Sequence, residues 1–155
     1  MTGASFCTME SPVGRLAIRM TGDAITALDW VNTEDSPPDT PNQIEVTRQI
    51  AAYFAGNLQN FTLPLTPEGT VHQKKVWAEM SKIPFGDLRT YGDLAQTISS
   101  GAQAVGNACG KNPIPIIVPC HRIIAAGGGI GGYSGRGGIV TKRILLTLEG
   151  AEPGQ

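Results

Sequence analysis

A cysteine and a histidine stand next to each other at the end of a proline-rich apolar run that extends from Pro113 to Pro119. Prolines fix φ and remove backbone donors, so this segment should be stiff and poorly suited to regular strand pairing. The thiolate is the nucleophilic form of cysteine, and a neighbouring imidazole can take the thiol proton directly or through one water. Cys120 and His121 are therefore a candidate activated nucleophile and its base.

A buried carboxylate would orient the imidazole of such a pair. Glu149, at the end of the apolar helical segment 142–148, is the best candidate in the chain. Each residue also has an ordinary explanation: Cys120 could be an inert core cysteine, His121 a core or surface histidine, and Glu149 a solvated acid at a helix end. The residue types alone leave both explanations open.

The cysteines suggest neither a disulfide framework nor a metal site. Cys7, Cys109 and Cys120 are odd in number, and reduced thiols of a cytoplasmic protein are the default. The cysteines lack the close-pair spacing of zinc ligands, and His72 lies far from His121 in the sequence. We therefore expect no bound metal.

The segment 125–138 contains eight glycines and resembles a phosphate-binding loop only superficially. It has no lysine–serine pair and no strand–loop–helix order with a downstream acid. It could line a pocket, with hydroxyls from Tyr133 and Ser134, or it could be a plain surface loop.

Composition bounds the class of protein. The chain has 155 residues, 41% of them hydrophobic, which is enough for one domain or two small ones. No run of about 18 apolar residues occurs, so a membrane span is not expected. The first residues lack a basic region followed by an apolar stretch, so secretion is not expected either. Residues 1–69 carry three bases and eight acids, whereas residues 70–155 carry nine bases and five acids. The C-terminal half could therefore face a polyanion, although ordinary scatter explains the asymmetry equally well.

Turn and periodicity signals predict two kinds of structure. Residues 1–30 should form β-hairpins, residues 32–42 a loop, and residues 44–54 a helix with Ile44 on its apolar face. The segment 63–69, with two prolines and a glycine, should be a linker.

Short helices should follow the linker. Thr70–Gln73 is a capping-box pattern that opens one helix, and Thr90–Asp93 opens a second. A tight turn at 99–101 joins the second helix to a third over 102–110, which is the helix-turn-helix pattern. Many helical hairpins with this spacing bind nothing.

The third helix has few large side chains. Ala102, Ala104, Gly106, Ala108 and Gly110 alternate along it. A helix that reads the major groove needs long polar side chains. A helix this bare suits close approach to a narrow surface such as a minor groove, but it equally suits tight packing against another helix, and composition alone favours packing.

At this point the sequence resembles the O6-alkylguanine-DNA alkyltransferases. The most specific element is the segment 112–124, which contains the Pro-Cys-His-Arg signature of that family. Further matching elements follow the family order over residues 69–150: Ile83–Gly86, Thr90-Tyr91, Ala104–Gly106, Gly132–Gly135, and Lys142 with Leu145-Leu146 and Glu149-Gly150. The N-terminal third is similar only in size and hairpin pattern.

The resemblance implies an α+β protein with two domains. Residues 1–66 would form a small β-rich, RNase H-like domain, and residues 67–155 a helical winged-helix domain with the helix-turn-helix. The implied function is direct reversal of DNA damage in the cytoplasm by a monomer that needs no cofactor. It would flip an O6-alkylguanine out of double-stranded DNA and move the alkyl group irreversibly to Cys120, so that each molecule reacts once; O4-alkylthymine is a further implied substrate.

Site roles carried over by the resemblance fall on matching positions. Cys120 would be the nucleophile, His121 its base through a water, Glu149 the group that orients His121, and Asn112 the residue that holds the turn before the active-site segment. The implied contacts with DNA or the flipped base are Tyr91, Gln103, Ala104, Gly106, Lys111, Arg122, Ile123, Tyr133 and Ser134.

Two positions depart from the family pattern. Gln103 stands where the family commonly has an arginine that fills the gap left by the flipped base. Glutamine lacks the charge and the planar cation, and the pattern Ser100–Gln103 could instead be a capping box. Arg136-Gly137 lengthens the loop after Ser134, which leaves the width of the pocket open.

Two other functions stay in view. A non-catalytic protein that binds alkylated bases and flags them would have lost the cysteine, commonly to tryptophan, so the presence of Cys120 argues against it. A thiol hydrolase using Cys120 and His121 would turn over its substrate repeatedly, whereas an alkyltransferase gains one alkyl group and stops.

Overall fold

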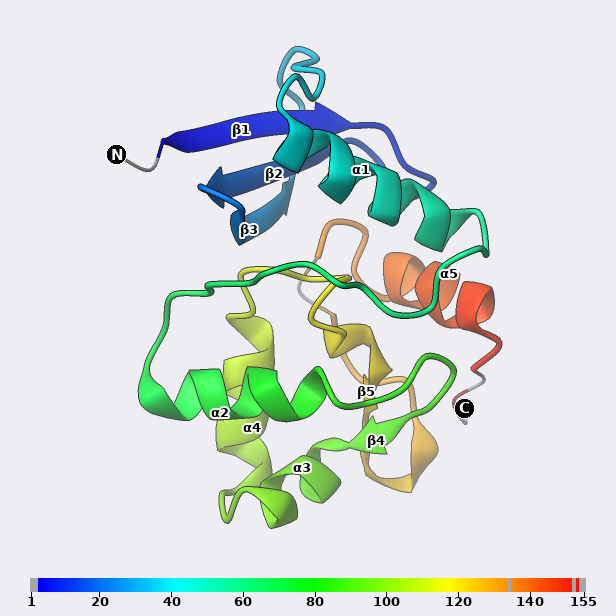
Figure 1. The fold of residues 1–155 in the computed structure, drawn as a ribbon. Coiled ribbons are helices and arrows are strands. Elements are labelled where there is room, and N and C mark those ends of the chain that lie inside the picture. The colour runs from blue at the N-terminus through cyan, green and yellow to red at the C-terminus, as the bar shows by residue number, and fades with distance from the viewer. Residues whose placement is uncertain (1–2, 134, 152, 154–155) are drawn as a thin grey trace. The chain divides into compact units, whose positions relative to one another are not determined.

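The computed structural model describes residues 3–133, 135–151 and 153. Contacts within the chain divide it into two compact units, residues 1–68 and 69–155. The first unit combines a small antiparallel sheet with one helix, and the second is built mainly from short helices (Figure 1). The α+β prediction is confirmed.

The first unit is a β-meander with a helix packed on it. Its elements are β1 (Ala4–Met9), β2 (Leu16–Thr21), β3 (Ala24–Trp30) and α1 (Pro41–Phe54). The strands pair antiparallel in the order β1-β2-β3. Gly22, in the tight turn between β2 and β3, has a φ of +61°, which glycine adopts without a steric penalty. After α1 the chain returns along β3, where the backbone of Ile25 bonds to Pro64 and Thr66 at 2.9 Å each.

Helix α1 begins at Pro41, three residues before the predicted start. Thr40 and Gln43 form a capping box, and Pro41 takes the first helical position, where its missing N–H is not needed. The prediction that Ile44 lies on the apolar face is wrong, because its side chain is 52% exposed. The buried stripe instead consists of Val46, Ile50 and Tyr53, together with two glutamines.

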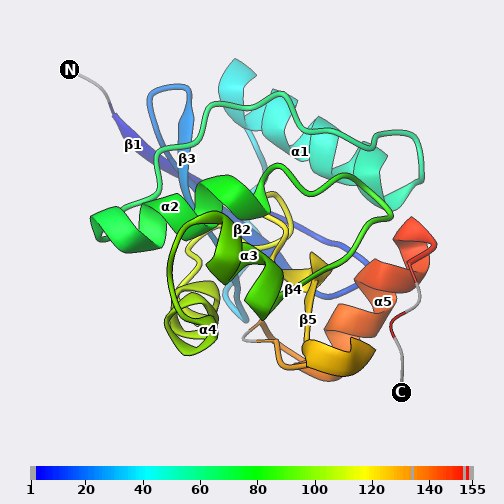
Figure 2. The same cartoon turned by 90° about the horizontal axis from the view of Figure 1, so that it is seen from below.

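The second unit contains the predicted helix-turn-helix. Its elements are α2 (Val71–Met80), β4 (Arg89–Thr90), α3 (Tyr91–Thr97), α4 (Ala102–Gly110), the 3₁₀ turns η1 (Cys120–Arg122) and η2 (Ala126–Gly128), β5 (Ile123–Ile124) and α5 (Ile139–Glu149). Figures 1 and 2 both show α2, α3 and α4 grouped together. The short strands β4 and β5 pair in parallel. Helix α5 starts three residues before the predicted segment 142–148.

Two buried contacts join helix α4 to helix α2. The indole Nε1 of Trp77 donates to the carbonyl of Ala108 at 2.8 Å, and the sulfurs of Cys109 and Met80 lie 3.3 Å apart. Both contacts are buried. They hold the C-terminal half of α4, which leads into the segment that carries Cys120.

The start of α4 differs from the capping-box alternative considered for Gln103. The residue that caps α4 is Gly101, which makes no side-chain cap. Ser100 bonds instead through its hydroxyl to Nε2 of His72, at 2.9 Å. Gln103 is exposed on the first turn of the helix and is not engaged in a cap.

Among the described residues, no helix is both long enough and apolar enough to cross a membrane.

Candidate active site

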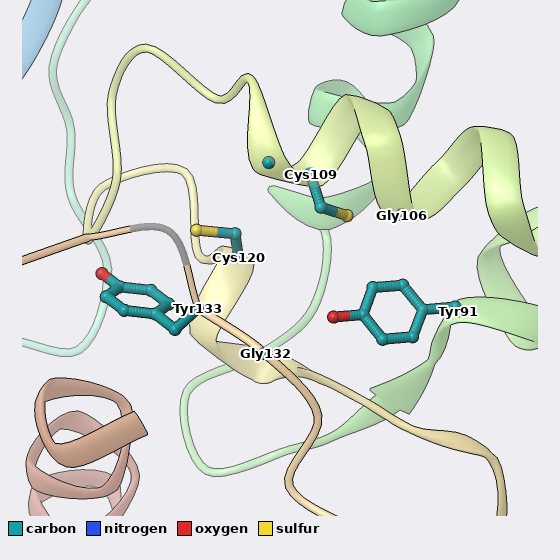
Figure 3. Close-up of a pocket in the computed structure, with 7 residues that line it drawn as sticks. Tyr91, Gly106, Cys109, Cys120, Gly132 and Tyr133 are labelled. Atoms are coloured by element: carbon teal, nitrogen blue, oxygen red, sulfur yellow. The ribbon is translucent and has the colours of Figure 1, made fainter. Parts of the chain in front are cut away.

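A cavity of about 300 Å³ lies in the second unit with Cys120 in its wall. The residues that line it come from α3, α4, η1 and the glycine-rich loop: Tyr91, Gly106, Cys109, Gly110, Cys120, Gly132 and Tyr133. Figure 3 shows the rings of Tyr91 and Tyr133 below α4, and the side chain of Cys109 extending from α4 toward the side on which Tyr91 lies. The volume is at the lower end of the range for small-molecule sites.

The side chain of Asn112 organises the proline-rich loop that precedes Cys120. The Nδ2 of Asn112 donates to the carbonyl of Val118 at 2.9 Å, and its Oδ1 accepts from the N–H of Ile114 at 3.0 Å. Asn112 therefore ties both ends of the loop to the end of α4.

Ile116, in the middle of this loop, has a φ of +74°. A β-branched residue rarely adopts the left-handed region, because its Cβ crowds the backbone. The side chain is fully buried, and the loop is closed by the bond from the N–H of Val118 to the carbonyl of Ile114 at 2.9 Å. Packing and hydrogen bonds together hold this strained conformation.

Cys120 is a buried, neutral thiol in the resting site. It is 6% exposed, and burial raises its pKa above the ordinary cysteine value, while a hydrogen bond with Asn112 and the nearby charge of Lys142 act in the opposite direction. Burial dominates because an ionised sulfur loses its hydration. The thiol must therefore lose its proton to a nearby base before it can act as a nucleophile.

His121, the next residue in the chain, is the candidate for that base. Its Nε2 lies 2.7 Å from Oε2 of Glu149, and neither side chain is exposed. Since a carboxylate only accepts hydrogen bonds, Nε2 carries the proton and Nδ1 offers its lone pair. Nδ1 has no hydrogen-bond partner among the described residues. Burial lowers the pKa of His121 below its usual value, so the ring is neutral and able to accept a proton.

Arg122 is buried in the protein interior, where it binds the carboxylate of this His121–Glu149 pair. Its Nε and Nη2 donate to the two oxygens of Glu149 at 2.8 and 3.0 Å, and its Nη1 donates to the carbonyl of Ile83 at 2.6 Å. The guanidinium carbon lies 5.9 Å from the centre of the Phe85 ring. Arg122 is 6% exposed, so these contacts differ from the DNA contact expected of it and make it a clamp on Glu149.

Lys142 is a second buried cation near the cavity. Its Nζ donates to the carbonyl of Ile123 at 2.5 Å and to that of Gly132 at 3.0 Å, and the residue has no exposed surface. Burial lowers the pKa of Lys142 to about 8. The side chain thus joins β5 to the glycine-rich loop beside Cys120.

The remaining predicted residues fall into three groups. Tyr91, Gly106 and Tyr133 line the cavity. Gln103, Ala104 and Lys111 are exposed on α4 and at its end. Ile123 is buried in β5 and is not among the lining residues, and Ser134 lies outside the described residues.

Sequence reasoning missed Cys109 as a wall of the cavity and Lys142 as a buried cation. The signal for Lys142 was present, because positions 142, 145, 146 and 149 form one helical stripe on which two charged residues flank two leucines. The signal for Cys109 was its spacing of three residues from Gly106, on the same face of α4.

Both units match one protein family. Residues 6–67 match the 6-O-methylguanine DNA methyltransferase, ribonuclease-like domain, and residues 71–151 match the DNA binding domain of the same family. The chain belongs to the 6-O-methylguanine DNA methyltransferase family. The resemblance seen in the segment 112–124 is confirmed, and residues 71–151 form the DNA-binding domain of this methyltransferase-family chain.

Relatives of this family member align over nearly the whole chain. A methylated-DNA–protein-cysteine methyltransferase of Methanosarcina acetivorans is 50% identical, over 94% of this chain and 98% of the relative. The constitutive enzyme of that name from Bacillus subtilis is 40% identical, over 93% and 94%. A crystal structure of the Mycobacterium tuberculosis protein in complex with DNA is 43% identical, with a TM-score of 0.84 over 94% of this chain and 92% of that chain.

Among the described residues of this methyltransferase-family chain, no three histidine, cysteine, aspartate or glutamate side chains gather in a metal-binding cluster.

Proposed function

We propose that the protein repairs DNA by taking the alkyl group from O6 of guanine onto Cys120, once per molecule. The observation that carries the proposal is a buried thiol in the wall of a cavity, next to a neutral histidine whose protonated nitrogen faces Glu149. The family relation supports the same chemistry. O4-alkylthymine in double-stranded DNA is a second substrate of the proposed reaction.

The step is one displacement at the alkyl carbon. His121 takes the thiol proton at Nδ1 through a water, and the sulfur of Cys120 bonds to the alkyl carbon as the bond from that carbon to O6 breaks. The electron pair passes to the guanine, which takes up one proton, so the net result is a thioether and an unmodified guanine. No oxidant, metal or soluble cofactor enters this balance.

Glu149 and Arg122 act through His121. The bidentate pair holds the carboxylate in place, and the carboxylate keeps the proton of His121 on Nε2. A fixed tautomer leaves Nδ1 as the acceptor, which is the state a general base needs. Asn112 supports the loop and stabilises the sulfur as its charge develops.

The flipped guanine enters the cavity from the side of α4 and α3. Tyr91 and Tyr133 offer aromatic faces on which a flipped purine can stack. Gly106 and Ala104 keep α4 bare enough for the minor groove, while Lys111 faces a phosphate. Gln103 occupies the gap left in the duplex.

Intact-protein mass spectrometry tests the transfer. The protein is incubated with duplex oligonucleotide that contains O6-methylguanine, and one methyl group per molecule should appear on Cys120 in the peptide map. Cys120→Ser should gain none, and Cys109→Ser is the matched control for the second thiol of the cavity. An unmodified protein that still binds the lesion would support a lesion-binding protein, and repeated turnover of a thioester would support a hydrolase.

A test of Gln103 asks whether its lost charge limits repair. Gln103→Arg adds a planar cation that can stack in the duplex and attract phosphate. The rate of methyl transfer from duplex DNA should rise severalfold, whereas the rate from a single-stranded oligonucleotide should change little. An unchanged rate on duplex DNA would contradict the role given to this position.

Cytoplasmic location and a monomeric state stay predictions from the sequence.

A further inference from the structure

The wall that α4 contributes to the cavity is made almost entirely of backbone. Gly106, Cys109 and Gly110 stand at positions i, i+3 and i+4 and therefore share one face of the helix. Cys109 is the only one of the three with a side chain; it lines the cavity, and Figure 3 shows it extending from α4 into the space above the ring of Tyr91. The depth of this wall is thus set by one thiol.

The two glycines are not required by packing inside the protein. A Cβ added at Gly110 would meet no heavy atom within 4 Å, and one added at Gly106 would meet only the ring of Tyr91, at 3.9 Å. Neither added Cβ would clash with the protein. The small residues of this face therefore leave room for something that occupies the cavity, not for another part of the chain.

This wall cannot move away from an occupant. The thiol of Cys109 rests against the core, because the sulfur of the fully buried Met80 lies 3.3 Å from its Sγ. One residue earlier, the carbonyl of Ala108 accepts the bond from Trp77 at 2.8 Å. Since protein interiors are close-packed, a longer side chain at position 109 must extend into the cavity.

We propose that Cys109 sets the largest alkyl group that the site accepts, and that its short side chain opens the site to aryl-sized O6 adducts such as benzyl. The inference rests on the proposed transfer to Cys120 and names its substrate range. A phenyl ring finds apolar and aromatic neighbours in this cavity, because Tyr91 and Tyr133 supply ring faces.

Cys109 itself takes no part in the displacement. Burial, together with the nearby Cys120, raises the pKa of the Cys109 thiol to about 12, so it stays protonated. It acts as a specificity residue because of its size and its place in the wall.

Two duplex oligonucleotides, one with O6-methylguanine and one with O6-benzylguanine, test the inference by intact-protein mass. The ratio of the benzyl to the methyl transfer rate is compared in the wild type, Cys109→Leu and Cys109→Ser. The leucine variant should lower this ratio by about tenfold or more, the scale by which small changes in an apolar pocket discriminate substrates. The serine variant preserves the size of the side chain and should keep the ratio within about threefold.

Gly110→Ala provides a second variant that does not depend on the larger substitution being tolerated. Its added methyl meets no protein atom, so the melting temperature should not fall, and the ratio should drop in the same direction by a smaller factor. A leucine variant that is folded but keeps the wild-type ratio would overturn the proposal, as would a wild type that takes methyl but not benzyl. A wild type that takes neither group would overturn the proposed function itself, and this inference with it.

Discussion

The two units of this chain bury different kinds of polar side chain. In the first unit, the described polar side chains that are buried are neutral: Thr8, Gln43 and Gln49. In the second unit they include His121, Arg122, Lys142 and Glu149, all within the region around Cys120.

The ion pairs of the first unit lie on its surface. Arg15–Glu10 and Arg48–Glu45 are largely exposed to solvent, where such pairs add little to stability. The second unit instead keeps a carboxylate, a guanidinium and an imidazole out of water, at a desolvation cost that only complete pairing offsets. The second unit thus concentrates its described buried charges around the candidate nucleophile, whereas the described charged side chains of the first unit are not buried.

Glu149→Gln should have the largest effect of the substitutions that test this contrast between the two units. The substitution leaves the guanidinium of Arg122 buried without its carboxylate, which should lower the free energy of unfolding of the second unit by about 3–5 kcal/mol. Alkyl transfer to Cys120 should fall with it, because His121 loses its fixed tautomer. Urea unfolding in a Trp30→Phe background, where Trp77 is the remaining tryptophan, reports the second unit.

Ile50→Ala is the counterpart in the first unit. Ile50 is fully buried, and its truncation should cost about 2–5 kcal/mol, seen through Trp30 in a Trp77→Phe background. Transfer to Cys120 should stay within about twofold while the first unit is folded. If Glu149→Gln destabilised both tryptophan environments equally, the contrast between the units would be lost.

A smaller effect is expected from pH. Burial holds the pKa of His121 below its ordinary value of 6.5, so its contribution to stability is complete above about pH 6.5 and is lost as the pH falls below that value. One such group gives a slope of at most about 1.4 kcal/mol per pH unit. The second unit should lose stability between pH 6.5 and 5.5, measured by urea unfolding at each pH.

The first unit contains no histidine, so its free energy of unfolding should change little between pH 6.5 and 5.5. His121→Gln should flatten the slope of the second unit, whereas His72→Gln, at a half-buried histidine, should preserve it. A slope that survives in His121→Gln would assign the effect to another group.

The smallest test compares two threonine helix caps. Thr40 caps α1 with Gln43 as its partner, and Thr90 caps α3 with Asp93, each in a capping box. Replacing either with alanine should cost its own unit about 1 kcal/mol, measured by urea unfolding. Only Thr90→Ala should slow alkyl transfer, since Tyr91 is the first residue of α3. An equal slowing in Thr40→Ala would show that the reaction depends on the first unit as well.

Local signals in the sequence predicted most of the secondary structure. The capping boxes at Thr70 and Thr90 start helices where expected, because a cap is decided by residues three positions apart. Ile44 was misplaced because steps of about 100° per residue put positions 44 and 53 on opposite sides of the helix, and Tyr53 is on the buried side.

The polar interior around Cys120 was only partly predictable. The Cys120–His121 pair was visible because its members are neighbours, and Glu149 was visible at a helix end. Local spacing shows which helix face carries Lys142 and Cys109, but it does not show what that face meets. The partners of these two residues, like the carboxylate that Arg122 binds, come from segments far apart in the sequence. Arg122 illustrates the difficulty. From the sequence, an arginine beside His121 was expected to contact DNA, but in the structure it is buried and pairs with Glu149.

The strained turn at Ile116 limits how far this active-site loop can be transplanted. Left-handed backbone at a β-branched residue costs about 1–2 kcal/mol, and the hydrogen bonds within residues 112–118 hold it together with the buried surroundings of Ile116, not alone. A peptide of this sequence, or a graft onto an unrelated scaffold, should relax at that residue and turn Cys120 away from His121. A designer who wishes to reuse the thiol must therefore carry over the hydrophobic surroundings of Ile116 along with the signature itself.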